Sequence, residues 1–201
     1  MRRAIVMGSV LIAAGVVAGC SPKESTPAAQ VQDDPSTTAS TQPATTAPPS
    51  DPTSAKHRAD LMPGQGGDVA GALDLVVNEG VVLMTGQVSG LKPESMHGFH
   101  IHEKGDCSSP DFKSAGEHFN PTSQAHGDPV MPPHHLGDIP NLVADEMGKA
   151  PVNARIEGVT LGDHGANDLV GRAVVVHAMP DDYKTQPSGN SGDRIACGVI
   201  Q

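Results

Sequence analysis

The sequence predicts an all-β domain in its last 140 or so residues. From Asp68 onward the apolar residues are mostly Val, Leu and Ile, in short runs separated by Gly, Asn and Asp, which is typical of strands joined by turns. No segment carries a convincing apolar stripe with the 3.6-residue period of a helix. The 23 glycines and 18 prolines are too few for a wholly low-complexity chain, so we expect part of the chain to fold.

The N-terminal segment has the features of an export signal. Arg2 and Arg3 precede an apolar run, 4–19, that is shorter than the about 20 residues of a membrane-spanning helix. Segment 17–20, Val-Ala-Gly-Cys, resembles the lipobox of bacterial lipoproteins, in which the cysteine is acylated and becomes the first residue after cleavage. We therefore expect residues 1–19 to be a lipoprotein signal peptide and Cys20 to carry the lipid. A plain secretory signal with an incidental cysteine is the alternative.

The segment 20–59 is expected to be a disordered tether. It is mostly Ser, Thr, Pro, Ala and Gln, and Val31 is the only branched apolar residue between Ser21 and Lys56. Such a composition buries too little apolar surface to offset the entropy lost on ordering. All the aromatic residues lie beyond it, so we place the folded domain at residues 60–201, a length that can bury a core on its own.

Short strands are expected in order along this domain. Apolar runs or alternation mark segments 72–77, 81–84, 98–103, 152–156 and 174–177. The stretch between Glu103 and Asn141 shows little strand signal and is rich in Gly, Pro and His. A structureless loop of that length in a compact domain indicates either disorder or function, and its histidines favour function.

Charge and cysteine content restrict the partners. The net charge is −10, from 13 Lys and Arg against 23 Asp and Glu, and no cluster of basic residues occurs. Nucleic-acid binding requires a basic surface, so we expect no nucleic-acid partner. The 3 cysteines are an odd number, which in an exported protein indicates a special use for one of them.

The histidines form the candidate functional site. His100 and His102 alternate with Ile101, so both imidazoles share one face of a strand. Alone, this pattern is more typical of an exposed polar face. Five further side chains with nitrogen or carboxylate ligands strengthen the metal-site interpretation: His118, His126, His135, Asp138 and His177. Imidazole suits copper and zinc, and three His with one Asp is an acceptable tetrahedral zinc set.

Four segments together resemble the copper/zinc superoxide dismutase family: 98–103 (GFHIHE), 114–121 (SAGEHFNP), 135–138 (HLGD) and 189–200 (GNSGDRIACGVI). The resemblance covers essentially the whole domain. It implies a Greek-key, eight-stranded β-barrel or sandwich of the immunoglobulin-like type, with long metal-binding and electrostatic loops. It also implies an oxidoreductase that dismutes superoxide to dioxygen and hydrogen peroxide at a redox-cycling copper.

The resemblance assigns a role to each candidate residue. The implied copper ligands are His100, His102, His118 and His177. The implied zinc ligands are His118, His126, His135 and Asp138, so that His118 bridges the metals and carries a proton during turnover. Cys107 and Cys197 match a disulfide, which requires an oxidising compartment. Arg194 would hold the superoxide anion next to copper. Asp181 matches a carboxylate that orients one histidine of each set, although a turn residue beside Asp182 is the alternative.

Several points stay open in the sequence. Of the remaining histidines, His57 is expected to be solvated and His97 and His164 to be structural. His134 adjoins His135, but the spacing to Asp138 favours His135 as the ligand. Lys104, Lys113 and Lys184 are the candidate cations for steering the substrate.

Two other functions compete with the enzyme. The first is an exported copper- or zinc-binding lipoprotein without turnover, and the second is an envelope or adhesion lipoprotein whose metals only stabilise the fold. We expect the domain to protect the cell envelope on its periplasmic side, although an outward-facing domain is the alternative. Ser21 rather than Asp after Cys20 favours an outer-membrane anchor. Whether the protein forms a homodimer stays open.

Overall fold

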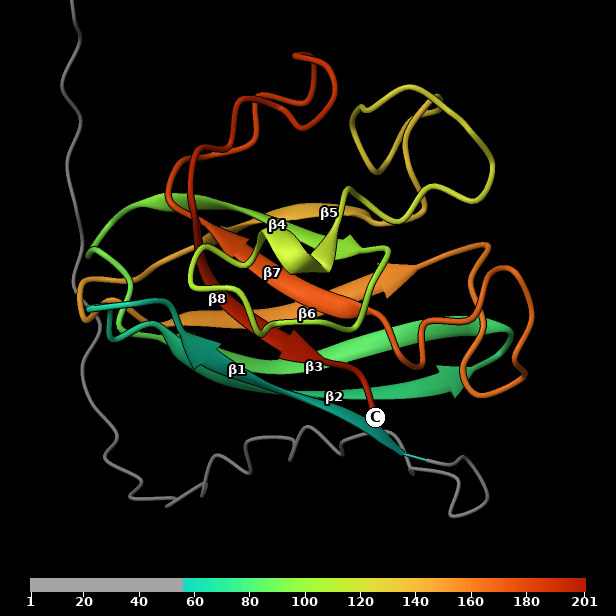
Figure 1. The fold of residues 1–201 in the computed structure, drawn as a ribbon, viewed down its shortest axis with the longest axis horizontal. Coiled ribbons are helices and arrows are strands. Elements are labelled where there is room, and N and C mark those ends of the chain that lie inside the picture. The colour runs from blue at the N-terminus through green and yellow to red at the C-terminus, as the bar shows by residue number, and fades with distance from the viewer. Residues whose placement is uncertain (1–55) are drawn as a thin grey trace, which may run out of the picture. The chain divides into compact units, whose positions relative to one another are not determined.

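The computed structural model describes residues 56–201, and the expected signal peptide, Cys20 and nearly all of the expected tether lie outside them. This part of the chain folds into eight strands (Figure 1). They are β1 (His57–Pro63), β2 (Ala70–Asn78), β3 (Val81–Ser89), β4 (Met96–His102), β5 (Asp138–Val143), β6 (Ala150–Ile156), β7 (Ala173–His177) and β8 (Arg194–Val199). One short 3-10 helix, η1 (Lys113–Ala115), lies in the loop after β4. Within residues 56–201 we find no helix of the length and apolarity needed to cross a membrane.

The strands form one antiparallel sheet that curls into a nearly closed barrel. Their order is β5-β4-β7-β8-β1-β2-β3-β6, and the edge strands β5 and β6 lie against each other. The chain crosses over between β3 and β4 and between β6 and β7, as in a Greek key. The all-β prediction is therefore confirmed, with the barrel architecture that the family resemblance implied.

The interior of the barrel follows from side-chain alternation. In β6 every second residue is buried, as the alternation of 152–156 predicted. All five residues of β7 are buried, which the apolar run ending at His177 predicted. Strands β2 and β3 form a hairpin whose two turn residues, Glu79 and Gly80, both have positive φ, the conformation that tight hairpins favour.

Two strands differ from the sequence expectations. β1 begins at His57, within the segment expected to be tether, and the partly exposed His57 ring donates a hydrogen bond to the Gln201 carbonyl (3.1 Å). β1 has weak strand propensity, but it is held on both sides because it pairs with β2 and with β8. β5 begins at Asp138, inside the stretch that showed little strand signal, because β4 supplies its pairing partner. Tertiary pairing overrides local propensity in both strands.

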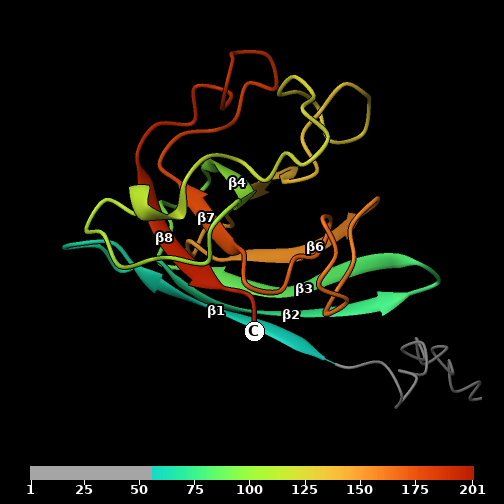
Figure 2. The same ribbon diagram turned by 45° about the vertical axis from the view of Figure 1, so that its right-hand side comes forward.

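Two long loops cover one side of the barrel. The first connects β4 to β5 and the second connects β7 to β8. Figure 1 and the rotated view in Figure 2 show the outer parts of these loops, coloured yellow and red, projecting from the same side beside β4 and β5. The histidine-rich site lies beneath them.

Candidate metal centre

The strands bring the predicted ligands together. His100 and His102 lie on β4, and His177 is the last residue of the neighbouring strand β7. His118 pairs with His102 in an isolated antiparallel bridge, and Asp138 opens β5 directly opposite His100. Each of these side chains is buried, with at most 5% of its surface exposed.

Seven side chains form two donor groups that share His118. The first group is His100, His102, His118 and His177, and the second is His118, His126, His135 and Asp138. Within each group the potential ligand atoms lie within 4.8 Å of one another. These donor groups contain the same residues as the two ligand sets that the family resemblance implied.

Hydrogen bonds outside the first group set which ring nitrogens face its centre. His102 Nδ1 lies 2.9 Å from the Gly116 carbonyl and His177 Nδ1 lies 3.2 Å from the Gly192 carbonyl, so both Nδ1 atoms donate. Each Nε2 atom therefore carries a lone pair rather than a proton, and the two Nε2 atoms face each other at 3.4 Å. His100 Nε2 contacts the Asp181 carboxylate at 2.8 Å, which leaves its Nδ1 as the free donor atom.

The same group contains buried polar atoms without a protein partner. His100 Nδ1 and His118 Nε2 are buried and accept or donate no hydrogen bond in the described structure. Burial holds the pKa of His177 at about 3 and that of His118 at about 4, and it lowers the pKa of His102 well below its usual value. These rings are therefore expected to stay neutral, so protonation does not supply partners for the buried nitrogens. Converging lone pairs of neutral imidazoles fit a soft or borderline cation such as copper.

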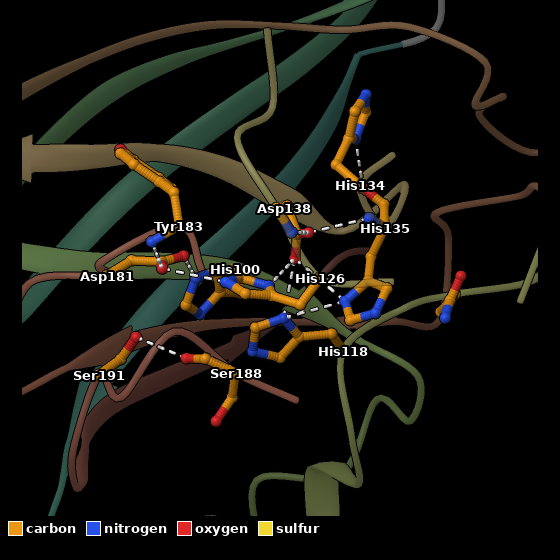
Figure 3. A network of polar contacts seen from close by, with 12 residues as sticks. His100, His118, His126, His134, His135, Asp138, Asp181, Tyr183, Ser188 and Ser191 are labelled. Atoms are coloured by element: carbon orange, nitrogen blue, oxygen red, sulfur yellow. Dashed lines mark hydrogen bonds and ion pairs between the residues drawn. The ribbon is translucent and has the colours of Figure 1, made fainter. Parts of the chain in front are cut away.

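The second group is built around the Asp138 carboxylate, as Figure 3 shows. Its Oδ1 lies 2.8 Å from His118 Nδ1, 3.1 Å from His126 Nδ1 and 3.2 Å from His135 Nδ1. Its Oδ2 accepts hydrogen bonds from the backbone N–H groups of Gly127 (3.2 Å) and His135 (2.8 Å). Burial opposes ionisation, but these bonds outweigh it and hold the pKa of Asp138 far below its usual range. Three imidazoles around one carboxylate fit a tetrahedral zinc ion.

The Asp181 carboxylate connects the two groups. Its Oδ2 accepts from His100 Nε2 at 2.8 Å and its Oδ1 accepts from His126 Nε2 at 3.0 Å. Burial would lower the pKa of His126, but the carboxylates of Asp138 and Asp181 outweigh it and raise the pKa to about 9. Asp181 is thus a buried carboxylate that contacts one histidine of each set, and its Oδ1 also accepts the Tyr183 backbone N–H at 2.7 Å, so the residue has a turn contact as well.

Several residues that support this arrangement were not predicted as part of the site. Gln186 exchanges two hydrogen bonds with the backbone of His126, at 2.9 and 2.8 Å. Asn141 exchanges two with the backbone of Asp181, at 2.8 and 2.9 Å. Gly189 lies so close to Asp181 and His126 that an added Cβ would overlap the Asp181 carboxylate. These contacts connect distant parts of the sequence, so spacing gives no signal for them.

Arg194 lies beside the first group and is fixed by the backbone. Its Nη1 donates to the Phe112 carbonyl and its Nη2 to the Gly116 carbonyl, both at 2.7 Å. The Gly116 carbonyl is also the acceptor for His102 Nδ1. The predicted disulfide between Cys107 and Cys197 is present, with Cα atoms 5.8 Å apart. It joins the loop that holds the guanidinium to the strand that carries it, so the cation has little freedom to move away.

A cavity of about 370 Å³ opens onto the first group, and we call it the copper cavity. It is lined by His102, His118, His177, Arg194, Lys113 and the carboxylates of Asp111, Glu117 and Asp193. Of the three lysines considered for steering, Lys113 alone lines this cavity, and it forms an ion pair with Asp111 at 2.8 Å. Lys104 instead lies 3.6 Å from Glu103.

Two of the remaining histidines have structural roles. His134 Nδ1 donates to the His135 carbonyl at 2.8 Å and belongs to neither donor group, so the spacing argument that favoured His135 is consistent with the geometry. His97 is buried between the Ser95 hydroxyl (2.7 Å) and the His177 carbonyl (2.8 Å), where it supports the end of β7. It matches the expectation for a structural histidine.

Comparisons with known proteins agree with this site. The family model described as copper/zinc superoxide dismutase matches residues 69–200. The chain is 43% identical over 151 residues to Superoxide dismutase [Cu-Zn] 2 of Aquifex aeolicus, covering 73% of this chain and 86% of that protein. It is 41% identical over 136 residues to the extracellular superoxide dismutase [Cu-Zn] of Haemonchus contortus, covering 65% and 72%.

Solved structures give the same result. A SOD-like protein from Bacillus subtilis superposes with a TM-score of 0.65 at 36% identity, covering 72% of this chain and 97% of that one. The clock protein EA4 superposes with a TM-score of 0.65, also at 36% identity, covering 75% and 96%. Matching sequence motifs, a matching barrel and two complete donor groups lead to one conclusion: the chain belongs to the copper/zinc superoxide dismutase family.

Proposed function

We propose that this protein is an exported, lipid-anchored superoxide dismutase that removes superoxide on the periplasmic side of the cell envelope. Family membership and the two donor groups support the reaction. The charged and apolar N-terminal segment and the lipobox-like sequence before Cys20 support export and anchoring, with the outer membrane favoured by Ser21. A disulfide in the folded domain fits an oxidising compartment.

The residues divide the chemistry between them. Copper held by the first group would supply one-electron redox chemistry, and zinc held by the second would fix His118 and the loops. Arg194 binds the anionic substrate, because its guanidinium faces the copper cavity while backbone carbonyls hold it in place. His118 Nε2 holds and delivers a proton for the peroxide product. Asp181 holds Nε2 of His100 and of His126, so that the Nδ1 atoms of both rings would be available to the metals.

One observation carries the catalytic proposal over simple metal storage. Both donor groups are complete, and the cavity that reaches the first group also contains a fixed arginine. A storage protein needs the ligands but has no need for a guanidinium fixed beside an open approach to copper. The arrangement of Arg194 therefore favours turnover of a small anion.

The test is a superoxide-dismutation assay on the metal-loaded protein. The His177→Ala variant removes a donor that belongs only to the first group, so we expect copper binding and activity to be lost. His134→Ala is the matched control, because this neighbouring histidine belongs to neither group. An inactive wild-type protein with full metal content, or a fully active His177→Ala variant, would refute the proposal.

Anchoring has its own test. We expect the wild-type protein to incorporate labelled fatty acid and to sediment with outer membranes. A Cys20→Ser variant should lose the label. Labelling that persists in this variant, or a wild-type protein recovered only in the soluble fraction, would contradict the anchor while leaving the catalytic proposal intact.

A further inference from the structure

A second cavity approaches the donor groups from the side of the second group, and it shares His118 and Glu117 with the copper cavity. It has a volume of about 430 Å³, and we call it the zinc-side cavity. Its lining includes His118, His135, Glu103, Glu117, Ala166 and Pro187. None of the three histidines that belong only to the first donor group lines it, whereas the copper cavity is lined by no residue that belongs only to the second group.

His135 is the donor of the second group that this cavity reaches most directly. Its side chain is 7% exposed, whereas those of His118, His126 and Asp138 are at most 2% exposed. Its Nδ1 faces Asp138 and His118, as Figure 3 shows, while its other ring nitrogen is turned away from Asp138. A cation arriving through the zinc-side cavity would thus meet His135 before the two fully covered donors.

The opening of this cavity carries an exposed carboxylate that can attract an incoming cation. Glu103 and Glu117 contribute two carboxylates: Glu103 lies 3.6 Å from Lys104, whereas Glu117 is exposed and forms no ion pair among residues 56–201. The one Lys or Arg side chain in the lining is Arg172, which is half-buried. It donates to the carbonyls of Glu103 and Asp168, and its guanidinium lies 4.7 Å from the centre of the Phe119 ring. Carboxylates at the opening raise the local concentration of a divalent cation.

We propose that the zinc-side cavity is the entrance through which Zn²⁺ reaches the second donor group, separate from the route to copper. Glu103 and Glu117 attract the hydrated cation, and His135 is the first donor to bind it. His126, Asp138 and His118 then complete the coordination. The inference rests on the proposed function, because it requires the second group to be the zinc site.

The experiment measures the rate of zinc uptake rather than enzymatic activity. The demetallated full-length chain is mixed with one equivalent of Zn²⁺ held by a chromogenic indicator, and colour loss gives the rate and the final stoichiometry. Ala166→Trp and Pro187→Trp each place a large side chain in the zinc-side cavity from an exposed position. Lys113→Trp is the matched control, since it fills the copper cavity from an exposed position.

We expect both zinc-side tryptophans to slow zinc uptake severalfold without changing the amount bound at equilibrium, and Lys113→Trp to leave the rate unchanged. Glu103→Gln should slow uptake by about threefold to tenfold, more so at low salt. Asp193→Asn is its control, because this carboxylate lines only the copper cavity. An unchanged equilibrium stoichiometry also shows that a slow variant is folded.

Three results would overturn the proposal. Slower uptake in Lys113→Trp but not in Ala166→Trp would mean that zinc enters past the copper ligands. Equal effects of all the tryptophans, or no effect of any, would mean that the two cavities do not act as separate routes. A different result would contradict the zinc site rather than the entrance. In that case His135→Ala would bind as much zinc at equilibrium as the wild-type chain.

Discussion

Replacing Gly189 by alanine tests how closely the loop after β7 must fit the metal centre. Gly189 has φ +65°, and an added Cβ would overlap Asp181 Oδ1 and lie 2.7 Å from His126 Nε2. Both neighbours are fully buried side chains, so Asp181 must move and lose its hydrogen bonds to His100 and His126. Loss of such orienting contacts typically weakens metal binding by about 10–100-fold. That range corresponds to about 1.4–2.7 kcal/mol.

The assay is a competition between the protein and a chelator of known affinity, run separately for zinc and copper. Gly66→Ala is the matched control, since Gly66 has φ +74° but no atom within 4 Å of an added Cβ. The control carries the backbone strain of a left-handed alanine, about 1–2 kcal/mol, without the overlap. If Gly189→Ala held both metals as tightly as Gly66→Ala does, the argument that Asp181 orients the ligands through this close fit would be wrong.

Three further predictions concern stability and turnover. Asp168→Ala should lower the free energy of unfolding by about 2 kcal/mol at pH 7, because the buried carboxylate accepts N–H bonds from Gly162, His164 and Val170 (2.7–2.9 Å). Burial opposes them, but they hold the pKa of Asp168 below 3.8, so this stabilisation is present above about pH 4 and fades as the pH falls. Replacing Cys107 and Cys197 together by serine should cost about 4 kcal/mol in denaturant unfolding, since the bridge spans 90 residues. Arg194→Ala should lower kcat/KM by about tenfold without altering metal content.

Each of these predictions has a result that contradicts it. For Asp168, the acid dependence of unfolding would be the same in the variant and the wild type. For the disulfide, the oxidised protein and its serine variant would unfold at equal denaturant concentrations. For Arg194, the variant would either keep full kcat/KM or lose its copper, and copper loss would mean that the guanidinium supports the ligands rather than the substrate.

Part of the two donor groups could be predicted because strand geometry is periodic. His100 and His102 share a face of β4, the family motifs contain His118, His135 and Asp138, and the wider family resemblance added His126 and His177. The residues around the ligands were less predictable. Gln186 contacts the backbone of His126, 60 residues away, and Gly189 leaves room for the Asp181 and His126 side chains. No local pattern encodes such contacts.

The fold shows the same division between local and distant information. β6 and β7 were predicted because burial on one or both faces leaves a pattern in their own residues. β1 and β5 were missed in part because their stability comes from neighbours: β2 and β8 for the first, β4 for the second. His57 and Asp138 therefore join the sheet although the sequence around them does not favour a strand.

Local charge explains how an acidic chain can act on an anion. Three carboxylates line the copper cavity of this acidic chain: Asp111, Glu117 and Asp193. The charge of Lys113 is offset by its ion pair with Asp111. Arg194 instead donates its hydrogen bonds to neutral carbonyls, so within residues 56–201 its positive charge is not paired with a carboxylate and faces the cavity. The net charge of −10 is distributed over the whole chain and is screened by salt beyond about 10 Å. A fixed guanidinium beside the copper ligands therefore determines anion binding more strongly than the sum of distant charges.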